Sequence, residues 1–304
     1  MIVDMPNTTA SKIGKRLNEL RETGGVVALG RVLTLIISAE EDRIETAISA
    51  ANGASRLHPA RIIVLAEMRN GTESKLDAEI RVGGDAGASE VVILRAYGAA
   101  SSNPESLVTG LLLPDAPVVA WWPTTCKAEP ANTPLGRIAQ RRITDSACQS
   151  DPVEFLAQLA KNYQPGDGDM AWTRITLWRS QLAALFEQHL DRKVISIKVF
   201  GASDSPSSVL LARWLEQRLQ APSEIVSMLG SNPISGIAGV RLEFETGAVQ
   251  IIREGEVAFI EQVGFPDSSV LLPRRSDQDC LIEDMRFLGE DEVYGEVLKG
   301  SVND

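Results

Sequence analysis

The sequence predicts an α/β protein with two domains, over residues 1–165 and 166–304. Short runs of β-branched and apolar residues alternate with segments whose apolar residues recur every three or four positions, which is typical of βαβ units. The runs at residues 32–38 and 61–67 are almost wholly apolar, as in strands buried on both faces of a parallel sheet. The segment 164–169, QPGDGD, is the strongest linker candidate, because Pro and Gly interrupt regular structure.

The first domain is expected to hold a mixed, mostly parallel sheet with flanking helices. A helix should begin after the possible caps Thr8, Thr9 and Ser11 and end at Gly24. Asn103-Pro104 and Asp151-Pro152 combine a cap with a proline in the first helical position, so each predicts the start of a helix. The remaining elements are a helix at residues 40–54 and strands at 32–38, 61–67, 76–82, 90–97 and 118–122. The order strand, helix, strand implies a right-handed crossover between parallel strands.

The second domain is expected to be α/β with an antiparallel meander. A long helix is predicted over residues 170–190, and Ser205-Pro206 should start a helix that ends near Leu219. Strands are predicted at residues 194–200, 225–229, 240–245, 249–253 and 257–263. The last three strands alternate in polarity and are separated by glycine-containing turns, which predicts the meander. A helix or helix pair should follow over residues 280–298.

Composition excludes several classes of partner. The chain has 304 residues, 44% of them hydrophobic and 23% charged, as in ordinary globular proteins. Its net charge of −11 is concentrated after residue 150, where 24 acidic residues face 14 basic ones. Nucleic acids and anionic membranes both require a positive surface, so neither is expected as a partner. Cys126, Cys148 and Cys280 are few and widely spaced, and the N-terminus lacks an apolar leader, so we expect free thiols in the cytoplasm.

The most informative segment is the predicted strand at residues 118–122, which ends in two adjacent tryptophans, Trp121 and Trp122. Their side chains should point to opposite faces of the sheet. Ligands commonly bind at the carboxyl ends of strands in open α/β sheets. Arg141 and Arg142 follow this segment. If they lie in a strand, their adjacent side chains should also face opposite ways, which favours a solvated or interface role over a shared phosphate. The strand end where a ligand would be expected therefore offers tryptophan and arginine side chains, which are suited to contact with a partner rather than to catalysis.

Two further clusters have alternative interpretations. Trp178 and Arg179 lie on the long predicted helix, six and seven residues after Trp172, so at most one of the two tryptophans can face a single core. The other would mark a second layer or an interface, where Trp and Arg are enriched. The loop containing Gly83, Gly84, Asp85 and Gly87 could form an anion-binding nest, or it could simply be a flexible connection between two strands.

No residue pattern predicts catalysis. His58 and His189 are the only imidazoles, and neither has a neighbouring nucleophile, so both are expected to be structural. No spacing of His, Cys or carboxylates predicts a metal site, and no glycine-rich phosphate loop opens a helix, so no cofactor is expected.

Several long strings in the chain resemble one family. They are MIVDMP, LGRVLTLIIS, ASRLHPARIIV, LDAEIRVGGDAGASEVVILRAYG, LLLPDAPVVAWWP, PLGRIAQRRITD and WTRITLWR. They are similar to the glucose-6-phosphate dehydrogenase assembly protein (OpcA) family in its actinobacterial form. The resemblance covers nearly the whole chain and is strongest over residues 1–180.

The resemblance implies a non-catalytic partner that binds glucose-6-phosphate dehydrogenase, promotes its active oligomer and so supports NADPH production in the oxidative pentose phosphate pathway. Partner contact is then expected from Trp121, Trp122, Arg141, Arg142, Trp178 and Arg179. The redox control attributed to a cysteine pair in the cyanobacterial branch is not expected, because the three cysteines here form no close pair. The alternatives are a sugar-phosphate enzyme of isomerase or lactonase type, which would use the Gly83–Gly87 loop, and a metabolite sensor.

Overall fold

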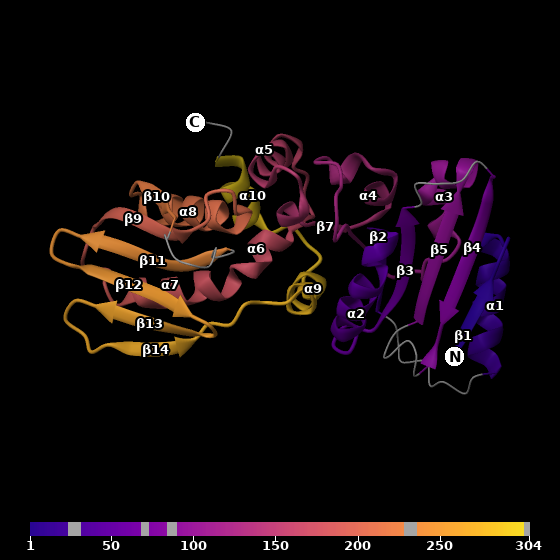
Figure 1. Ribbon diagram of the computed structural model, residues 1–304, viewed down its shortest axis with the longest axis horizontal. Helices are drawn as coiled ribbons and strands as arrows, with labels where there is room; N and C mark the ends of the chain where they lie inside the picture. The colour runs from indigo at the N-terminus through magenta and orange to yellow at the C-terminus, as the bar shows by residue number, and fades with distance from the viewer. Residues whose placement is uncertain (24–31, 68–72, 84–89, 228–235, 301–304) are drawn as a thin grey trace. The chain divides into compact units, whose positions relative to one another are not determined.

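A computed structural model describes residues 1–23, 32–67, 73–83, 90–227 and 236–300. The chain divides into two compact units, and neither unit is a continuous stretch of sequence. Unit 1 contains residues 1–148, 164–168 and 276–291, and unit 2 contains the remaining segments. The two units are described separately below, with the element labels of Figure 1.

Unit 1 is built on an eight-stranded sheet with the order β1-β4-β5-β3-β2-β6-β7-β8. Its elements are β1 (Ile2–Met5), α1 (Ala10–Thr23), β2 (Leu33–Glu40), η1 (Glu41–Arg43), α2 (Ile44–Ala54), β3 (Ala60–Glu67), β4 (Lys75–Arg81), β5 (Glu90–Tyr97), η3 (Gly98–Ser102), α3 (Pro104–Thr109), β6 (Val118–Trp121), η4 (Pro130–Asn132), α4 (Pro134–Ile138), β7 (Arg141–Thr144), η5 (Ser146–Cys148), β8 (Asp167–Asp169) and α9 (Asp277–Arg286). The last residue of β8, Asp169, belongs to unit 2.

The five strands β5, β3, β2, β6 and β7 are parallel to one another, whereas β4 pairs antiparallel with β5, and β1 pairs antiparallel with β4. The chain builds outward from β2 through β3 to β5, then returns and builds outward in the other direction through β6 and β7. This is the order of a doubly wound sheet, and its reversal lies between β2 and β6. The predicted mixed, mostly parallel sheet is confirmed.

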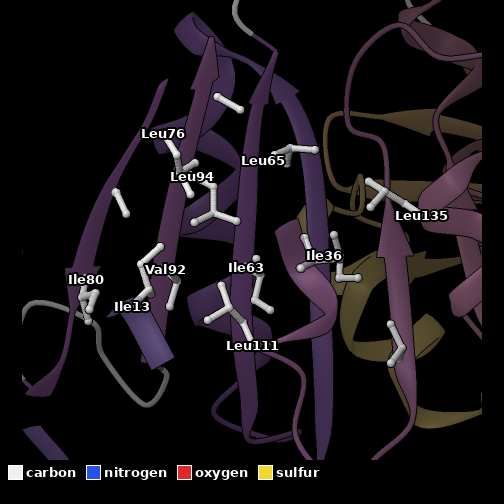
Figure 2. Close-up of a cluster of buried hydrophobic side chains, with 14 of the residues drawn as sticks. Ile13, Ile36, Ile63, Leu65, Leu76, Ile80, Val92, Leu94, Leu111 and Leu135 are labelled. Atoms are coloured by element: carbon white, nitrogen blue, oxygen red, sulfur yellow. The ribbon is translucent and has the colours of Figure 1, made fainter. Parts of the chain in front are cut away.

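The central strands β2, β3, β5 and β6 are buried on both faces, as their apolar runs predict. Ile36, Ile63 and Val92 lie on one face and pack with Ile13 of α1 in a single buried cluster, part of which Figure 2 shows. The alternate residues of the same strands are buried too, and α2 contacts β2 and β3. The predicted caps are also present: Asn103 accepts a hydrogen bond from the Ser106 amide, and Asp151 accepts one from the Glu154 amide.

Unit 2 holds a six-stranded sheet with the order β10-β9-β11-β12-β13-β14. In Figure 1 the strands β11 to β14 run side by side as a meander, and each pairs antiparallel with the next. The elements are α5 (Pro152–Asn162), α6 (Met170–Arg174), α7 (Thr176–Glu187), β9 (Val194–Gly201), α8 (Pro206–Leu219), β10 (Ser223–Val226), β11 (Ile237–Phe244), β12 (Ala248–Glu254), β13 (Val257–Gln262), β14 (Ser268–Leu271) and α10 (Glu292–Lys299). The predicted α/β unit with an antiparallel meander is confirmed.

Two predictions about local structure are wrong, and several short strands were not predicted. The segment 164–169 is not a linker, because it contains β8, whose residues are buried in the structure. The helix predicted over residues 170–190 is broken at Ile175, which has φ −92° and ψ 5° and separates α6 from α7. Strands β1, β8 and β14 were not predicted as elements, and β7 was considered only as a possible strand position for Arg141 and Arg142.

Candidate functional site

A cavity in unit 1 lies at the reversal of the doubly wound sheet. Its volume is about 400 Å³. Strands β2, β3 and β5 contribute residues at their carboxyl ends, and Trp122 follows the end of β6. The full lining is Ser38, Leu65, Ala66, Ala96, Ser101, Pro104, Trp122, Thr133, Pro134 and Leu135. This is the position at which open α/β sheets most often bind a ligand.

Trp122 is the largest side chain in the lining, and it is only 5% exposed. Its backbone amide donates to the carbonyl of Ile143, which fixes it at the edge between β6 and β7. Trp122 belongs to the buried cluster on the α1 face of the sheet, and Trp121 does not. That difference agrees with the predicted opposite orientation of the two side chains. Trp121 is 1% exposed, so both rings are enclosed.

Two short helices begin at the cavity. Pro104 is the first residue of α3 and Pro134 the first residue of α4, so neither position has a backbone N–H to offer a ligand. Asn103 and Thr133 cap these helices by accepting from the amides of Ser106 and Gly136. The helix starts at this cavity are therefore largely satisfied within the protein.

The crossover that leaves β2 carries acidic residues. Glu40 is the last residue of β2, and Glu41 and Asp42 form the start of η1 before α2. In dinucleotide-binding sheets of this order, the first such crossover is glycine-rich and its amides hold the pyrophosphate. Glu40 also accepts a hydrogen bond from Thr125 Oγ1 at 3.1 Å, and Glu41 forms an ion pair with Arg95 at 2.9 Å. Carboxylates repel a pyrophosphate, so these residues do not fit a dinucleotide.

Arg141 and Arg142 are buried, which contradicts the expectation that they are solvated, whereas a role at an interface stays a prediction. They lie side by side on β7 and bind different carboxylates, as their predicted opposite orientation requires. Arg141 Nη2 lies 2.5 Å from Asp284 Oδ1 of α9. Arg142 pairs with Asp167 of β8 and also donates to the Ala139 carbonyl at 2.9 Å. Burial raises the pKa of Asp167 despite this pairing. Both arginines attach late segments of the chain to the first sheet.

In unit 2, Trp172 and Trp178 are both buried, which agrees with the alternative that the second ring meets another layer of the protein. The break at Ile175 places them on two separate helices, which removes the constraint of a single helical face. Arg179 is partly buried and its guanidinium lies 3.7 Å from the Trp172 ring centroid. Arg253 lies over the Trp178 ring, and burial, with the charge of Arg274, lowers its pKa to about 10.

The other candidate sites from the sequence either have a structural role or lie partly outside the described residues. His189 is buried between Phe244 and Phe265 and hydrogen-bonds Gln262 at 3.1 Å, so its expected structural role is supported. Of the proposed anion nest, Gly83 is described and has φ +71°, whereas Gly84, Asp85 and Gly87 lie outside the described residues. Among the residues that the structure describes, no group of three or more His, Cys, Asp or Glu could hold a metal ion.

An exposed apolar surface in unit 2 escaped the sequence reasoning. Phe259 of β13 is 48% exposed and Leu271 of β14 is 73% exposed. The register pairs Phe259 with Ser269 and Val257 with Leu271, so Val257, Phe259 and Leu271 share one face of the sheet. The alternate residues Ala258 and Ile260 are buried on the other face. The alternation of β13 was visible in the sequence, but which face lay open was not. We call Val257, Phe259 and Leu271 the β13–β14 face.

No helix in the described part of the chain is both long and apolar enough to cross a membrane. None of the three cysteines, all of which lie among the described residues, is in a disulfide: Cys126 is half-buried, Cys148 exposed and Cys280 buried.

Comparison with known families gives two adjoining matches. The model described as the glucose-6-phosphate dehydrogenase subunit N-terminal domain matches residues 51–161, and the model described as the C-terminal domain of that subunit matches residues 165–298. A curated relative, the putative OxPP cycle protein OpcA of Synechocystis sp., is 26% identical over 139 residues. The match covers 43% of this chain and 29% of that relative, so the chain spans less than a third of the relative's length.

Oxidoreductases are among the solved structures that resemble this chain. An oxidoreductase from Sinorhizobium meliloti has a TM-score of 0.52 and 10% identity, over 88% of this chain and 95% of that one. The UDP-N-acetylglucosamine 3-dehydrogenase GnnA from Acidithiobacillus ferrooxidans has a TM-score of 0.45 and 9% identity, over 89% of this chain and 96% of that one. At 10% identity, the similarity to the Sinorhizobium meliloti oxidoreductase indicates a shared fold and says nothing about activity.

Proposed function

This chain belongs to the glucose-6-phosphate dehydrogenase subunit family, and from that membership we propose that it binds glucose-6-phosphate dehydrogenase and promotes the active oligomer of that enzyme without catalysing a reaction itself. The two adjoining domain matches, over residues 51–161 and 165–298, are the observation that carries the proposal. Membership confirms the resemblance to the OpcA family, while the actinobacterial form stays a prediction.

Two features favour a non-catalytic role for a fold that oxidoreductases also use. Glu40, Glu41 and Asp42 stand where a dinucleotide-binding sheet would present glycine amides to a pyrophosphate. His189, a conceivable general base, is enclosed by two phenylalanine rings and bonded to an amide side chain. The fold then serves as a scaffold for contact, because function is carried by the site rather than by the fold.

We assign the main contact to the β13–β14 face. Strand β14 is the edge of its sheet. Phe259 on β13 and Leu271 on β14 are large, apolar and exposed, as in many protein–protein interfaces. The contact roles of Trp121, Trp122, Arg141, Arg142, Trp178 and Arg179 stay proposals. Five of these residues are buried and would act indirectly, by stabilising the fold. Arg179 is partly exposed.

Promotion of an active oligomer has a thermodynamic requirement. The protein must bind the active form of the dehydrogenase more tightly than the inactive form, by about 1–3 kcal/mol for a 5–150-fold effect. By reciprocity, substrate that favours the active form tightens the complex by the same factor. More NADPH would then form because a larger share of the dehydrogenase is in its active form.

The test measures the cognate dehydrogenase with and without the protein. The mass of the dehydrogenase oligomer, its kcat and its KM for glucose 6-phosphate are recorded over a titration. We expect a larger oligomer and at least one improved kinetic constant. A Phe259→Ser, Leu271→Ser double variant should lose the effect, whereas Phe287→Ser, which changes an exposed apolar side chain of unit 1, should retain it.

If wild-type protein leaves the oligomer mass and both constants unchanged, the proposed function is wrong. If the wild type acts but the double variant acts equally well, only the assignment of the β13–β14 face fails. Turnover of a sugar phosphate by the isolated protein would favour the enzyme alternative instead.

A further inference from the structure

We propose that the face of the unit 2 sheet that carries Phe259 binds the same face of a second copy of this chain, so that the protein forms a reversible two-fold dimer. We call this side of the sheet the open face, and it includes the β13–β14 face. The inference concerns unit 2 alone and does not rest on the proposed function, because it is tested without the dehydrogenase. A second copy and the dehydrogenase would compete for the same surface.

An apolar row crosses the open face from β9 to β13. The strand register pairs Phe259 of β13 with Ile252 of β12. Ile252 pairs in turn with Gly239 of β11, and Gly239 pairs with Phe200 of β9. Directly paired residues share one face of a sheet, so all four lie on the open face. A Cβ added at Gly239 would collide with Ile252 Cδ1 and lie 3.3 Å from Phe200 Cδ2, so these two side chains close over the bare backbone of Gly239 and make the row continuous.

A charged row runs beside the apolar row, two residues away on each strand. Lys198 of β9 lies 3.7 Å from the carboxylate of Glu243, and Arg241 of β11 lies 3.0 Å from the same carboxylate. These three side chains together carry one positive charge, and the Lys198 side chain is 41% exposed. Gln250 of β12 separates them from Glu261 of β13, which is exposed. The row is therefore positive toward β9 and negative toward β13.

This pattern is complementary to itself about a two-fold axis that runs along the strands between β11 and β12, the two central strands of the sheet. The rotation lays β9 over β13 of the second copy. Lys198 then meets Glu261 of the second copy, and Phe200 meets Phe259 of the second copy, each contact occurring twice. Glu224 of β10 lies over the edge strand β14 of the second copy, away from Glu261. Opposite charges and apolar side chains thus face each other across the interface.

The size of the open face sets the strength of the dimer. Six strands about 4.8 Å apart give a width of about 24 Å, and three rows of outward residues give a length of about 20 Å. Two such faces bury about 1,000 Å² in total, which is at the lower limit for a specific interface. We therefore expect a reversible dimer with a dissociation constant on the order of 10 µM.

The experiment measures the mass of the isolated full chain by sedimentation velocity at concentrations from about 1 to 200 µM, which bracket this constant. The mass should rise from monomer to dimer. Lys198→Glu and Glu261→Lys each bring like charges together twice, so each variant alone should dimerise at least tenfold more weakly. An equimolar mixture of the two variants should dimerise as well as the wild type, because the mixed dimer restores both opposite-charge contacts.

Two further variants complete the set. Phe259→Ser removes an exposed apolar side chain of the row, so it should fold and dimerise at least tenfold more weakly. Glu187→Lys makes the same change of charge as Glu261→Lys at the exposed end of α7, outside the open face, and should dimerise like the wild type. Circular dichroism verifies that each variant is folded.

A monomer mass at every concentration up to about 200 µM overturns the proposal and leaves the proposed function intact, since no dehydrogenase is present. A dimer that survives both Glu261→Lys and Phe259→Ser overturns the assignment of the open face. If Lys198→Glu and Glu261→Lys are both folded and their mixture remains monomeric, the two-fold arrangement is wrong.

Discussion

Arg141 and Asp284 form a buried ion pair across 143 residues of sequence, with Nη2 and Oδ1 2.5 Å apart. Arg141 lies on β7 and Asp284 on α9, so the pair attaches a late helix to the first sheet. Both side chains are almost completely buried, which makes the pair sensitive to the loss of one partner but not a large source of net stability.

Asp284→Ala should lower the free energy of unfolding by about 3–5 kcal/mol, because it leaves the Arg141 guanidinium buried without its carboxylate. Urea unfolding followed by circular dichroism measures the change. Arg286→Ala, on the exposed end of the same helix, is the control and should change stability by about 0.5 kcal/mol or less. Equal unfolding midpoints for the two variants would show that the pair is not buried in solution.

Gly166→Ala should destabilise unit 1 more than Gly264→Ala destabilises unit 2. Gly166 has φ +91° and Gly264 has φ +89°, so both substitutions incur similar backbone strain of about 1–2 kcal/mol. A Cβ at Gly166 would also lie 2.3 Å from the Gln140 carbonyl oxygen, whereas nothing lies within 4 Å of one at Gly264. Thermal unfolding of the two variants checks the difference, and similar losses would contradict the close approach at Gly166.

Two aspartates should titrate on opposite sides of their ordinary pKa of 3.8. The Asn7 amide, 2.8 Å from the Asp77 carboxylate, lowers the pKa of Asp77, while burial raises the pKa of Asp167. NMR titration of the carboxyl carbons measures both values. A pKa of Asp77 above that of Asp167 would refute the assignment.

The same shifts set opposite pH dependences of stability. The contribution of Asp77 is complete above its unfolded pKa and is lost as pH falls through its lower folded value. The contribution of Asp167 has the reverse sign: stability is gained as pH falls through its raised folded value toward 3.8. Asp77→Asn should therefore flatten the acid side of the stability curve, and Asp167→Asn should steepen it. Unfolding in urea between about pH 2 and 6 checks the signs.

Nicotinamide dinucleotides should leave the melting temperature nearly unchanged, within about 1 °C at millimolar concentration. The reason is the acidic crossover at Glu40, Glu41 and Asp42, which cannot hold a pyrophosphate. Differential scanning fluorimetry with NAD⁺ and NADP⁺ tests this, with a dinucleotide-dependent dehydrogenase as the positive control. A rise of several degrees would mean that the crossover rearranges to accept the cofactor.

Local signals predicted much of the fold. Asn103, Asp151 and Ser205 are caps whose side chains accept the expected amide hydrogen bonds, so three helix starts followed from short sequence patterns. The apolar run of β2 gave a strand buried at every residue but its last. The break at Ile175 was missed because no Gly or Pro marks it.

The candidate site was only partly predictable. Trp122 was placed at a strand end where a ligand would bind, because the strand itself was evident from Val118 to Trp121. The burial of Arg141 and Arg142 was not, since Asp284 and Asp167 lie far along the chain and no pattern links them. The β13–β14 face was also missed, because alternation reveals two faces without saying which is covered.

The division of unit 1 among three stretches of sequence has a consequence for synthesis on the ribosome. Strand β8 and helix α9, which supply the carboxylates for Arg142 and Arg141, belong to segments 164–168 and 276–291. Until segment 276–291 has been synthesised, the Arg141 side chain on β7 lacks the Asp284 carboxylate. A fragment truncated at residue 165 would lack both Asp167 and Asp284, so we expect its sheet to be less stable than the same sheet in the full chain.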